Sequence, residues 1–296
     1  MNNYVRPEKI SSDMGGTDNQ FDDRLSQELE LLGTLSFKGY SKVLDIGVGK
    51  AQIAKWFSSK GFEVIGTGLE IESYEINSKE LEVKYGIKII ECNIEKMPFA
   101  DNSFDIIVMS HVLEHCYNVG IALQEVKRLL APEGIVCVFV PTHDDFVCSG
   151  HISMGWNLGQ LMYVLLLNGF RVKDGKFCQY GSNVSAVIKK NNCDLPLLRG
   201  DRGDIHILDK EGYLPLPIIS KDKLNDNFFG RIGAINWDID SLVKKNRKKK
   251  STVHKLLMLI LPTIPNKVIY FFAVRLYSFS RMIAVNMKVD FFQSPN

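Results

Sequence analysis

The chain has 296 residues and a formal net charge of +2, and its 45% hydrophobic content is enough for a substantial core. No charged-then-apolar leader opens the sequence, so we do not expect export. Six cysteines form no C-x-x-C pair, and several lie in apolar runs. This favours reduced thiols in a cytosolic protein over a disulfide framework.

The charge is unevenly distributed along the chain. Residues 244–296 hold eleven Lys or Arg and one acid, a net charge of +10, which leaves −8 for the first 243 residues. The body is therefore acidic and the tail basic. An acidic body disfavours a polyanionic partner, so we expect no nucleic acid.

Residues 1–40 are expected to form a lead-in with one helix. Its polar first twenty residues are followed by Phe21, Leu25, Leu29 and Leu32 at helical spacing. A helix over 21–32 could help to close a ligand site at the sheet edge, or it could be a plain packing helix.

Residues 42–70 predict a buried strand, a glycine turn, a helix and a second buried strand. The first strand is an apolar run, which is typical of a parallel strand covered on both faces. Gly47 and Gly49 allow a ligand to approach main-chain N–H groups without meeting a Cβ. Asp45, just before the turn, could hold the turn's amides or an ammonium group of the ligand.

The spacing of the turn distinguishes between ligands. A dinucleotide fingerprint would need glycine at Gln52, and the chain contains no P-loop motif. The pattern D-x-G-x-G-x-A at residues 45–51 resembles the first motif of class I S-adenosylmethionine-dependent methyltransferases. The resemblance implies S-adenosyl-L-methionine as cofactor. It also implies an α/β, Rossmann-like fold, with a seven-stranded, mostly parallel sheet, one antiparallel strand and helices on both faces.

The end of the second strand departs from the family's V-x-G-x-D pattern. Gly68 stands where the ribose-binding acid is usual, and the first carboxylate is Glu70, which returns to the same face if the strand continues. We expect Glu70 to bind the ribose. Glu72 is the fallback, and a solvated loop acid is the alternative.

Residues 87–109 also resemble the family, with a strand, a polar residue, x-x-P-F, D-x-S-F-D and a further apolar strand in order. The resemblance implies that Asn93 and the main chain of Ile94 contact the adenine. Asn93 replaces the more usual aspartate, and its amide carbonyl can still accept from an amine.

Residues 111–115 read H-x-x-E-H, the inverted zincin motif, which would require one helix carrying both histidines around zinc. Because the segment directly follows a predicted strand, we expect no metal site. The resemblance instead places Ser110 and His111 at the sugar or methionine end of the cofactor. His115 is either near the site or a structural histidine.

The step L-x-P-x-G at residues 130–134 extends the resemblance over 41–141. A helix over 158–168 and strands over 170–178 and 184–189 would complete the sheet. Ligands of open α/β sheets bind beyond the carboxyl ends of the strands, so the loop at 142–146 and His151 should face the methyl acceptor. His143 or His151 is the candidate base, with Asp144 as orienting partner, and His111 and His115 are second choices.

We therefore expect a methyltransferase domain over 41–190, an irregular extension near the substrate mouth over 191–240, and a basic amphipathic appendage over 241–296. Residues 244–285 combine a lysine block with a helix that has a basic stripe, which suits an anionic membrane surface. Packing on protein, as in a homo-oligomer, and a nucleic-acid patch are the alternatives for this tail.

The expected function is methyl transfer to oxygen or nitrogen, on a sugar, phosphate or lipid-linked glycan of the cell envelope in a surface-polysaccharide pathway. The expected location is the cytoplasm, peripheral on the inner membrane face. A soluble small metabolite is the alternative acceptor. A non-catalytic partner protein that keeps the fold is the alternative outside enzymes.

Overall fold

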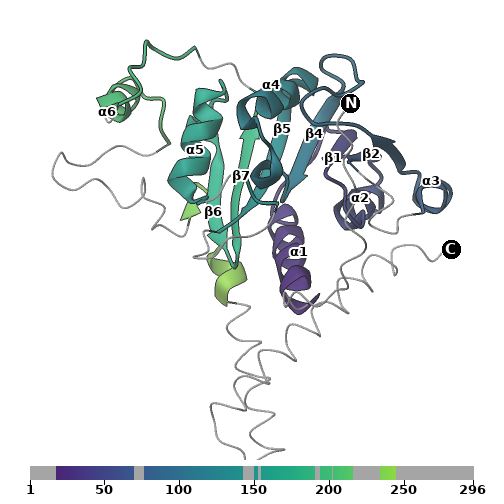
Figure 1. Ribbon diagram of the computed structural model, residues 1–296. Coiled ribbons are helices and arrows are strands. Elements are labelled where there is room, and N and C mark those ends of the chain that lie inside the picture. The colour runs from purple at the N-terminus through teal and green to yellow at the C-terminus, as the bar shows by residue number, and fades with distance from the viewer. Residues whose placement is uncertain are drawn as a thin grey trace, which may run out of the picture.

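The computed structural model of the chain describes residues 18–69, 77–142, 150–152, 155–190, 194–201, 203–215 and 234–244, with side chains from residue 24. Within these residues the centre is an eight-stranded sheet in the order β3-β2-β1-β4-β5-β7-β6-β8 (Figure 1). The strands are β1 (Lys42–Ile46), β2 (Glu63–Gly68), β3 (Lys88–Glu91), β4 (Phe104–Ser110), β5 (Leu130–Pro141), β6 (Lys176–Tyr180), β7 (Asn183–Lys189) and β8 (Ala234–Ile235).

The first five strands pair in parallel, as the apolar runs of the sequence predict. β7 is antiparallel to both β5 and β6. The Rossmann-like fold is thus confirmed, with two corrections. Residues 170–178 do not form one strand, because the 3-10 helix η3 (Val172–Asp174) precedes β6. An eighth strand, β8, pairs antiparallel with β6 and comes from the extension.

Helices cover both faces of the sheet (Figure 1). α4 (Val119–Leu129) and α5 (Leu158–Leu167) pack on one face with Ile107 and Met109. α1 (Asp18–Leu32), α2 (Gln52–Ser58) and α3 (Ser78–Tyr85) pack on the other with Ile106 and Val108. The alternation along β4 divides its buried side chains between the two cores, which is the pattern of a strand covered on both sides.

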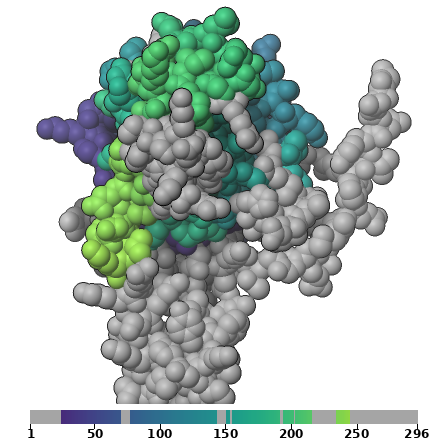
Figure 2. All heavy atoms as spheres, turned by 90° about the vertical axis from the view of Figure 1, so that its left-hand side faces the viewer, coloured from purple at the N-terminus to yellow at the C-terminus, as the bar shows by residue number. Residues whose placement is uncertain are grey.

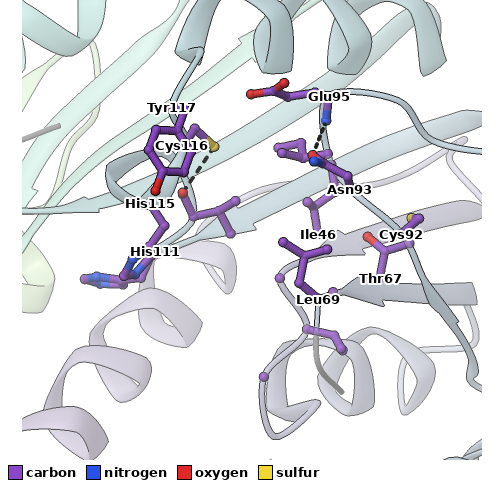
Figure 3. Close-up of a pocket in the computed structure, with 16 residues that line it drawn as sticks. Ile46, Thr67, Leu69, Cys92, Asn93, Glu95, His111, His115, Cys116 and Tyr117 are labelled. Carbon is purple, nitrogen blue, oxygen red and sulfur yellow. Dashed lines mark hydrogen bonds between the residues drawn. The ribbon is translucent and has the colours of Figure 1, made fainter. Parts of the chain in front are cut away.

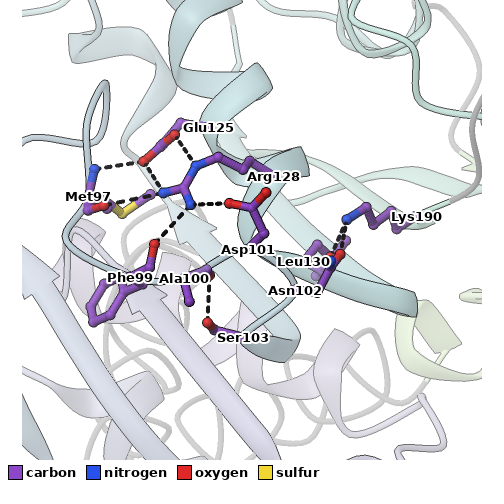
Figure 4. A network of polar contacts seen from close by, with 10 residues as sticks. All are labelled: Met97, Phe99, Ala100, Asp101, Asn102, Ser103, Glu125, Arg128, Leu130 and Lys190. Carbon is purple, nitrogen blue, oxygen red and sulfur yellow. Dashed lines mark hydrogen bonds and ion pairs between the residues drawn. The ribbon is translucent and has the colours of Figure 1, made fainter.

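Charged side chains of α4 and of the D-x-S-F-D segment fix the loop before β4. Arg128, at the end of α4, donates to both oxygens of Glu125 at 2.7 and 2.8 Å and to Asp101 Oδ1 at 2.6 Å. Its guanidinium also donates to the carbonyl oxygens of Met97 and Phe99 at 3.2 and 2.8 Å (Figure 4). One side chain therefore joins α4 to the loop 97–103.

Replacing Arg128 with alanine should lower the free energy of unfolding by roughly 2 kcal/mol, because two backbone carbonyls and Glu125 lose their charged donor. The matched control is Arg171→Ala, which removes an exposed pair with Asp174 and should change stability by less than about 0.5 kcal/mol. Urea unfolding of both variants measures the difference. Equal effects would mean that the network does not hold the loop.

The extension has more ordered structure than its turn-rich sequence indicates. It contains α6 (Gly203–Lys210) as well as β8, and Figure 2 shows its described parts, in green and yellow-green, on one face of the molecule. Asp204 accepts from the backbone N–H groups of Arg199, Gly200 and Asp201. Trp237 Nε1 donates to Thr34 Oγ1 at 3.1 Å, which ties the extension to the end of α1.

Among the helices that the structure describes, none has the length and apolar character that crossing a membrane requires. Residues 245–296, which carry most of the predicted membrane-binding appendage, lie outside the described residues.

Candidate functional site

Two adjoining cavities lie at the carboxyl ends of β1, β2 and β4. The larger has a volume of about 340 Å³ and the smaller of about 70 Å³. Both are lined by the glycine turn, residues 47–49, and by His111. The site thus lies where an open α/β sheet is expected to bind its ligand.

The turn is held in a conformation that requires glycine. Gly47 has φ +69°, and a Cβ there would lie 2.4 Å from Cγ2 of Val112. The N–H of Val48 donates to the carbonyl oxygen of Thr67 at 2.8 Å, which fixes the turn against β2. Glycine at position 47 is therefore required both by the backbone conformation and by the packing of Val112.

The smaller cavity is lined by charged groups of both signs. The charged residues in its lining are Arg24, Glu28, Asp45 and Lys50. Asp45 is 2% exposed, and burial raises its pKa to about 7, against the opposing hydrogen bond of the Ala54 backbone and with a further increase from the charge of Glu28. No described residue gives its Oδ2 a hydrogen bond. A cationic ligand group would stabilise the ionised form.

His111 lines both cavities and adopts the left-handed conformation, with φ +54°. Its Nδ1 lies 3.0 Å from Glu114 Oε1 and its Nε2 lies 3.4 Å from Glu28 Oε1 and 2.9 Å from Asn183 Oδ1. Burial alone would lower the pKa of His111, but the two carboxylates outweigh it and raise the pKa to about 9. The choice of His111 as a second-choice base stays a prediction, and a cationic imidazole would first have to lose its proton.

Ser110 also faces the smaller cavity, and its hydroxyl donates to Glu28 Oε2 at 2.7 Å. Arg24 and Glu28, one helical turn apart on α1, are functional candidates that the sequence reasoning missed. The signal was present: a charged pair at i and i+4 lies beside the predicted apolar face of that helix. The expectation that this helix helps to close the site agrees with the three α1 residues, Arg24, Leu25 and Glu28, that line the cavity.

The larger cavity holds the predicted adenine contacts, Asn93 and Ile94. Figure 3 shows Asn93 and Glu95 on one side of this cavity and His115 and Tyr117 on the other. Asn93 Oδ1 accepts from the N–H of Glu95 at 2.9 Å, so the carbonyl predicted to meet the adenine amine already has a donor. Glu95 lines the cavity with a carboxylate, and it is a further acceptor that the motif comparison did not single out.

The residues predicted to bind the ribose lie outside the described part of the chain. Gly68 and Leu69 line the larger cavity, while Glu70 and Glu72 lie outside the described residues. His143 and Asp144 also lie outside them. These four residues remain predictions.

His115 and His151 come together at the edge of the larger cavity, which His115 lines. Their rings are perpendicular with centroids 4.9 Å apart, and His115 Nδ1 lies 2.7 Å from the carbonyl oxygen of Gly150. The H-x-x-E-H segment is not one helix, because the 3-10 helix η2 covers only Leu113–His115. The reason given for rejecting the inverted zincin motif is thus confirmed.

The two cavities together fit S-adenosylmethionine. Its amino-acid end carries one carboxylate and one ammonium, which match Arg24 and the buried Asp45 in the smaller cavity. Its nucleoside would occupy the larger cavity beside Asn93 and Ile94. The two cavities share the lining residues 47–49 and His111.

Comparison with known proteins supports this cofactor. Residues 44–138 match the family described as a methyltransferase domain. The chain is 33% identical over 119 residues to the uncharacterized methyltransferase YcgJ of Bacillus subtilis, covering 38% of this chain and 47% of that protein. It is 33% identical over 149 residues to the ubiquinone/menaquinone biosynthesis C-methyltransferase UbiE of Haemophilus ducreyi, covering 47% and 55%.

A solved structure of a methyltransferase from Thermotoga maritima aligns with 58% of this chain and 92% of its own, at 19% identity and a TM-score of 0.47. The chain spans about half the length of the curated relatives it matches. The matched segment runs from β1 to β5 and contains the glycine turn, Asn93 and His111. Residues 44–138 are therefore a methyltransferase domain of the class I S-adenosylmethionine-dependent type.

Proposed function

We propose that this chain transfers a methyl group from S-adenosylmethionine to an oxygen or nitrogen acceptor. The observation that carries the proposal is the joined pair of cavities, one lined by charges of both signs and one lined by apolar walls and the polar residues after β3. A ligand with a zwitterionic end and a nucleoside body matches the linings of both cavities. The domain family of residues 44–138 supports the same cofactor.

S-adenosylmethionine supplies an electrophilic methyl group, so the chain's own residues have to position the acceptor and remove its proton. His115 is suited to the second task when its Nδ1–H donates to the Gly150 carbonyl, because Nε2 then keeps its lone pair. Burial lowers the pKa of His151, which keeps that ring neutral at neutral pH. His151 therefore stays a candidate base, beside His115.

For the acceptor, we propose a sugar, phosphate or lipid-linked glycan of the cell envelope. The basic residues of 244–285 support this choice, because they suit an anionic surface on the inner membrane face. Within the described residues, none of 194–244 lines either cavity. A role of the extension at the substrate mouth remains part of the proposal.

A carbon acceptor is the second candidate. Leu69 and Tyr117 line the larger cavity while 61% and 84% exposed, so its entrance is partly apolar and aromatic. The relatives named as ubiquinone/menaquinone biosynthesis C-methyltransferases favour the same choice. An aromatic ring could stack at this entrance.

A transfer assay separates the two acceptors. The full chain is incubated with S-adenosylmethionine carrying a labelled methyl group and with either a membrane glycolipid fraction or a reduced naphthoquinone. Label on glycan oxygen or nitrogen is the expected result, and it should fall at least about tenfold in His151→Ala but not in His206→Ala, an exposed histidine on α6. Label on ring carbon would support the second candidate, and no transfer to any acceptor class would contradict the proposal.

A further inference from the structure

Three side chains that bind metals well gather beside the larger cavity. One ligand atom from each of Glu114, His115 and His151 lies within 4.8 Å of the others. They come from two segments, η2 after β4 and the loop after β5. The N–H of Ile152 donates to the carbonyl oxygen of Glu114 at 2.6 Å, and this bond holds the two segments together. The backbone of the fold therefore holds these three side chains close together.

The contacts of His115 are those of a metal-ligating histidine. His115 Nδ1 lies 2.7 Å from the Gly150 carbonyl oxygen and must donate to it, because a carbonyl cannot donate. Metal-ligating histidines are usually held this way, with one ring N–H on a backbone carbonyl and the other nitrogen on the metal. The ring of His151 lies perpendicular to that of His115, with the ring centroids 4.9 Å apart.

Glu114 supplies the carboxylate. It is fully buried, and Nδ1 of His111 lies 3.0 Å from its Oε1. No described residue donates a hydrogen bond to Oε2. His111 also lies 3.4 Å from Glu28 Oε1, so it serves two carboxylates. A buried carboxylate in this position is costly, and a cation on its second oxygen would offset the cost.

We propose that Glu114, His115 and His151 bind one divalent metal ion of the zinc type. Two imidazole nitrogens and one carboxylate oxygen are a ligand set that zinc accepts while keeping a position open. Ligand atoms around tetrahedral zinc are about 3.4 Å apart, so the side chains must close by ~1 Å from their present separation. This set replaces His111 of the H-x-x-E-H motif with His151.

The position of the ion deepens the proposed function, on which this step rests. His115 lines the larger cavity, so an ion on its free nitrogen would lie at the edge where the acceptor enters. An open metal position binds an oxygen donor and lowers the pKa of a hydroxyl. The acceptor would then be a hydroxyl compound, and His115 would be a ligand rather than a base.

Metal binding is tested directly, without the cofactor. The full chain is stripped with a chelator and titrated with Zn²⁺ by calorimetry and with Co²⁺ by visible absorption. One equivalent should bind with micromolar affinity or better, with the cobalt bands of a site containing nitrogen ligands. His115→Ala, His151→Ala and Glu114→Gln should each weaken binding at least about tenfold, since each removes one of three ligands. His206→Ala should not.

If the variant at the buried Glu114 does not fold, the variant at the half-buried His151 tests metal binding instead. Binding that survives His151→Ala, or no stoichiometric binding, would overturn the proposal. Titration of the stripped protein with S-adenosylhomocysteine keeps the two proposals separate. If that ligand binds and the metal does not, only the metal site is wrong; if the metal binds and that ligand does not, the metal site stands and the methyltransferase function fails.

Discussion

Replacing Asp45 with asparagine is expected to weaken binding of the cofactor while stabilising the unliganded protein. The ammonium of the ligand would lose its charged partner, which should cost about 2–3 kcal/mol, or roughly 30- to 150-fold in affinity. Without ligand, the carboxylate is buried near Glu28 and its pKa is raised to about 7 by burial. The asparagine removes this unfavourable charge.

The stability gain of Asp45→Asn should be larger at high pH than at low pH. Because the pKa of Asp45 in the folded state lies above its ordinary value of 3.8, folding becomes less favourable as pH rises from about 4 to 7 and stays so above that range. Asp45→Asn should therefore raise the Tm by about 4 °C at pH 8 and by much less at pH 5. Thermal unfolding and calorimetry with S-adenosylhomocysteine measure the two effects.

The control for Asp45→Asn is Glu91→Gln, which removes an exposed acid on β3. It should change neither the Tm nor the affinity for S-adenosylhomocysteine appreciably. The cofactor should also bind wild-type protein more weakly as pH falls below 7, since the carboxyl must then lose a proton to bind the ammonium. Unchanged affinity in the asparagine variant would contradict the assignment of Asp45 to the ligand's cationic end.

His111 is expected to make the fold less stable as pH rises from 6.5 to 9. Its pKa is raised to about 9 in the folded protein by Glu114 and Glu28, against the effect of burial. The stabilisation is therefore fully present below 6.5, the ordinary value, and is lost as pH passes through 9. Its size should be on the order of 3 kcal/mol.

The variant His111→Asn tests this without adding backbone strain, because asparagine tolerates the left-handed conformation at φ +54°. Urea unfolding at pH 6.5, 7.5 and 9 should show a falling free energy of unfolding in wild type and a flatter profile in the variant. His206→Asn on α6 should retain the wild-type slope. A wild-type profile that is level over this range would mean that His111 is not held as a cation.

Much of the fold could be predicted because its signals are local. The apolar runs that became β1, β2, β4 and β5 lie between Gly47, Gly61, Pro98 and Gly134, so strand type and order followed from the sequence. β8 has only two residues in a turn-rich segment. Its pairing with β6 depends on a contact between distant segments, and the pattern of the segment does not contain that information.

The glycine turn and the residues after β3 could be predicted as part of the site, because their motif fixes them at strand ends. The charged residues of the smaller cavity could not be predicted from the sequence. Arg24 reaches His111 across 87 residues, and Glu28 meets Ser110 across 82. Such contacts follow from how α1 packs on the sheet. The raised pKa of His111 depends partly on Glu28, which the same packing brings to it.

The central claim is that the two cavities bind one ligand, with the amino-acid end in the smaller and the nucleoside in the larger. Calorimetric titration of the full chain with S-adenosylhomocysteine and with adenosine tests it most directly. We expect micromolar binding of S-adenosylhomocysteine, at least about tenfold weaker binding of adenosine, and loss of this difference in Asp45→Asn because adenosine does not enter the charged cavity. Equal binding of both ligands by wild type, or no binding of S-adenosylhomocysteine, would contradict the account.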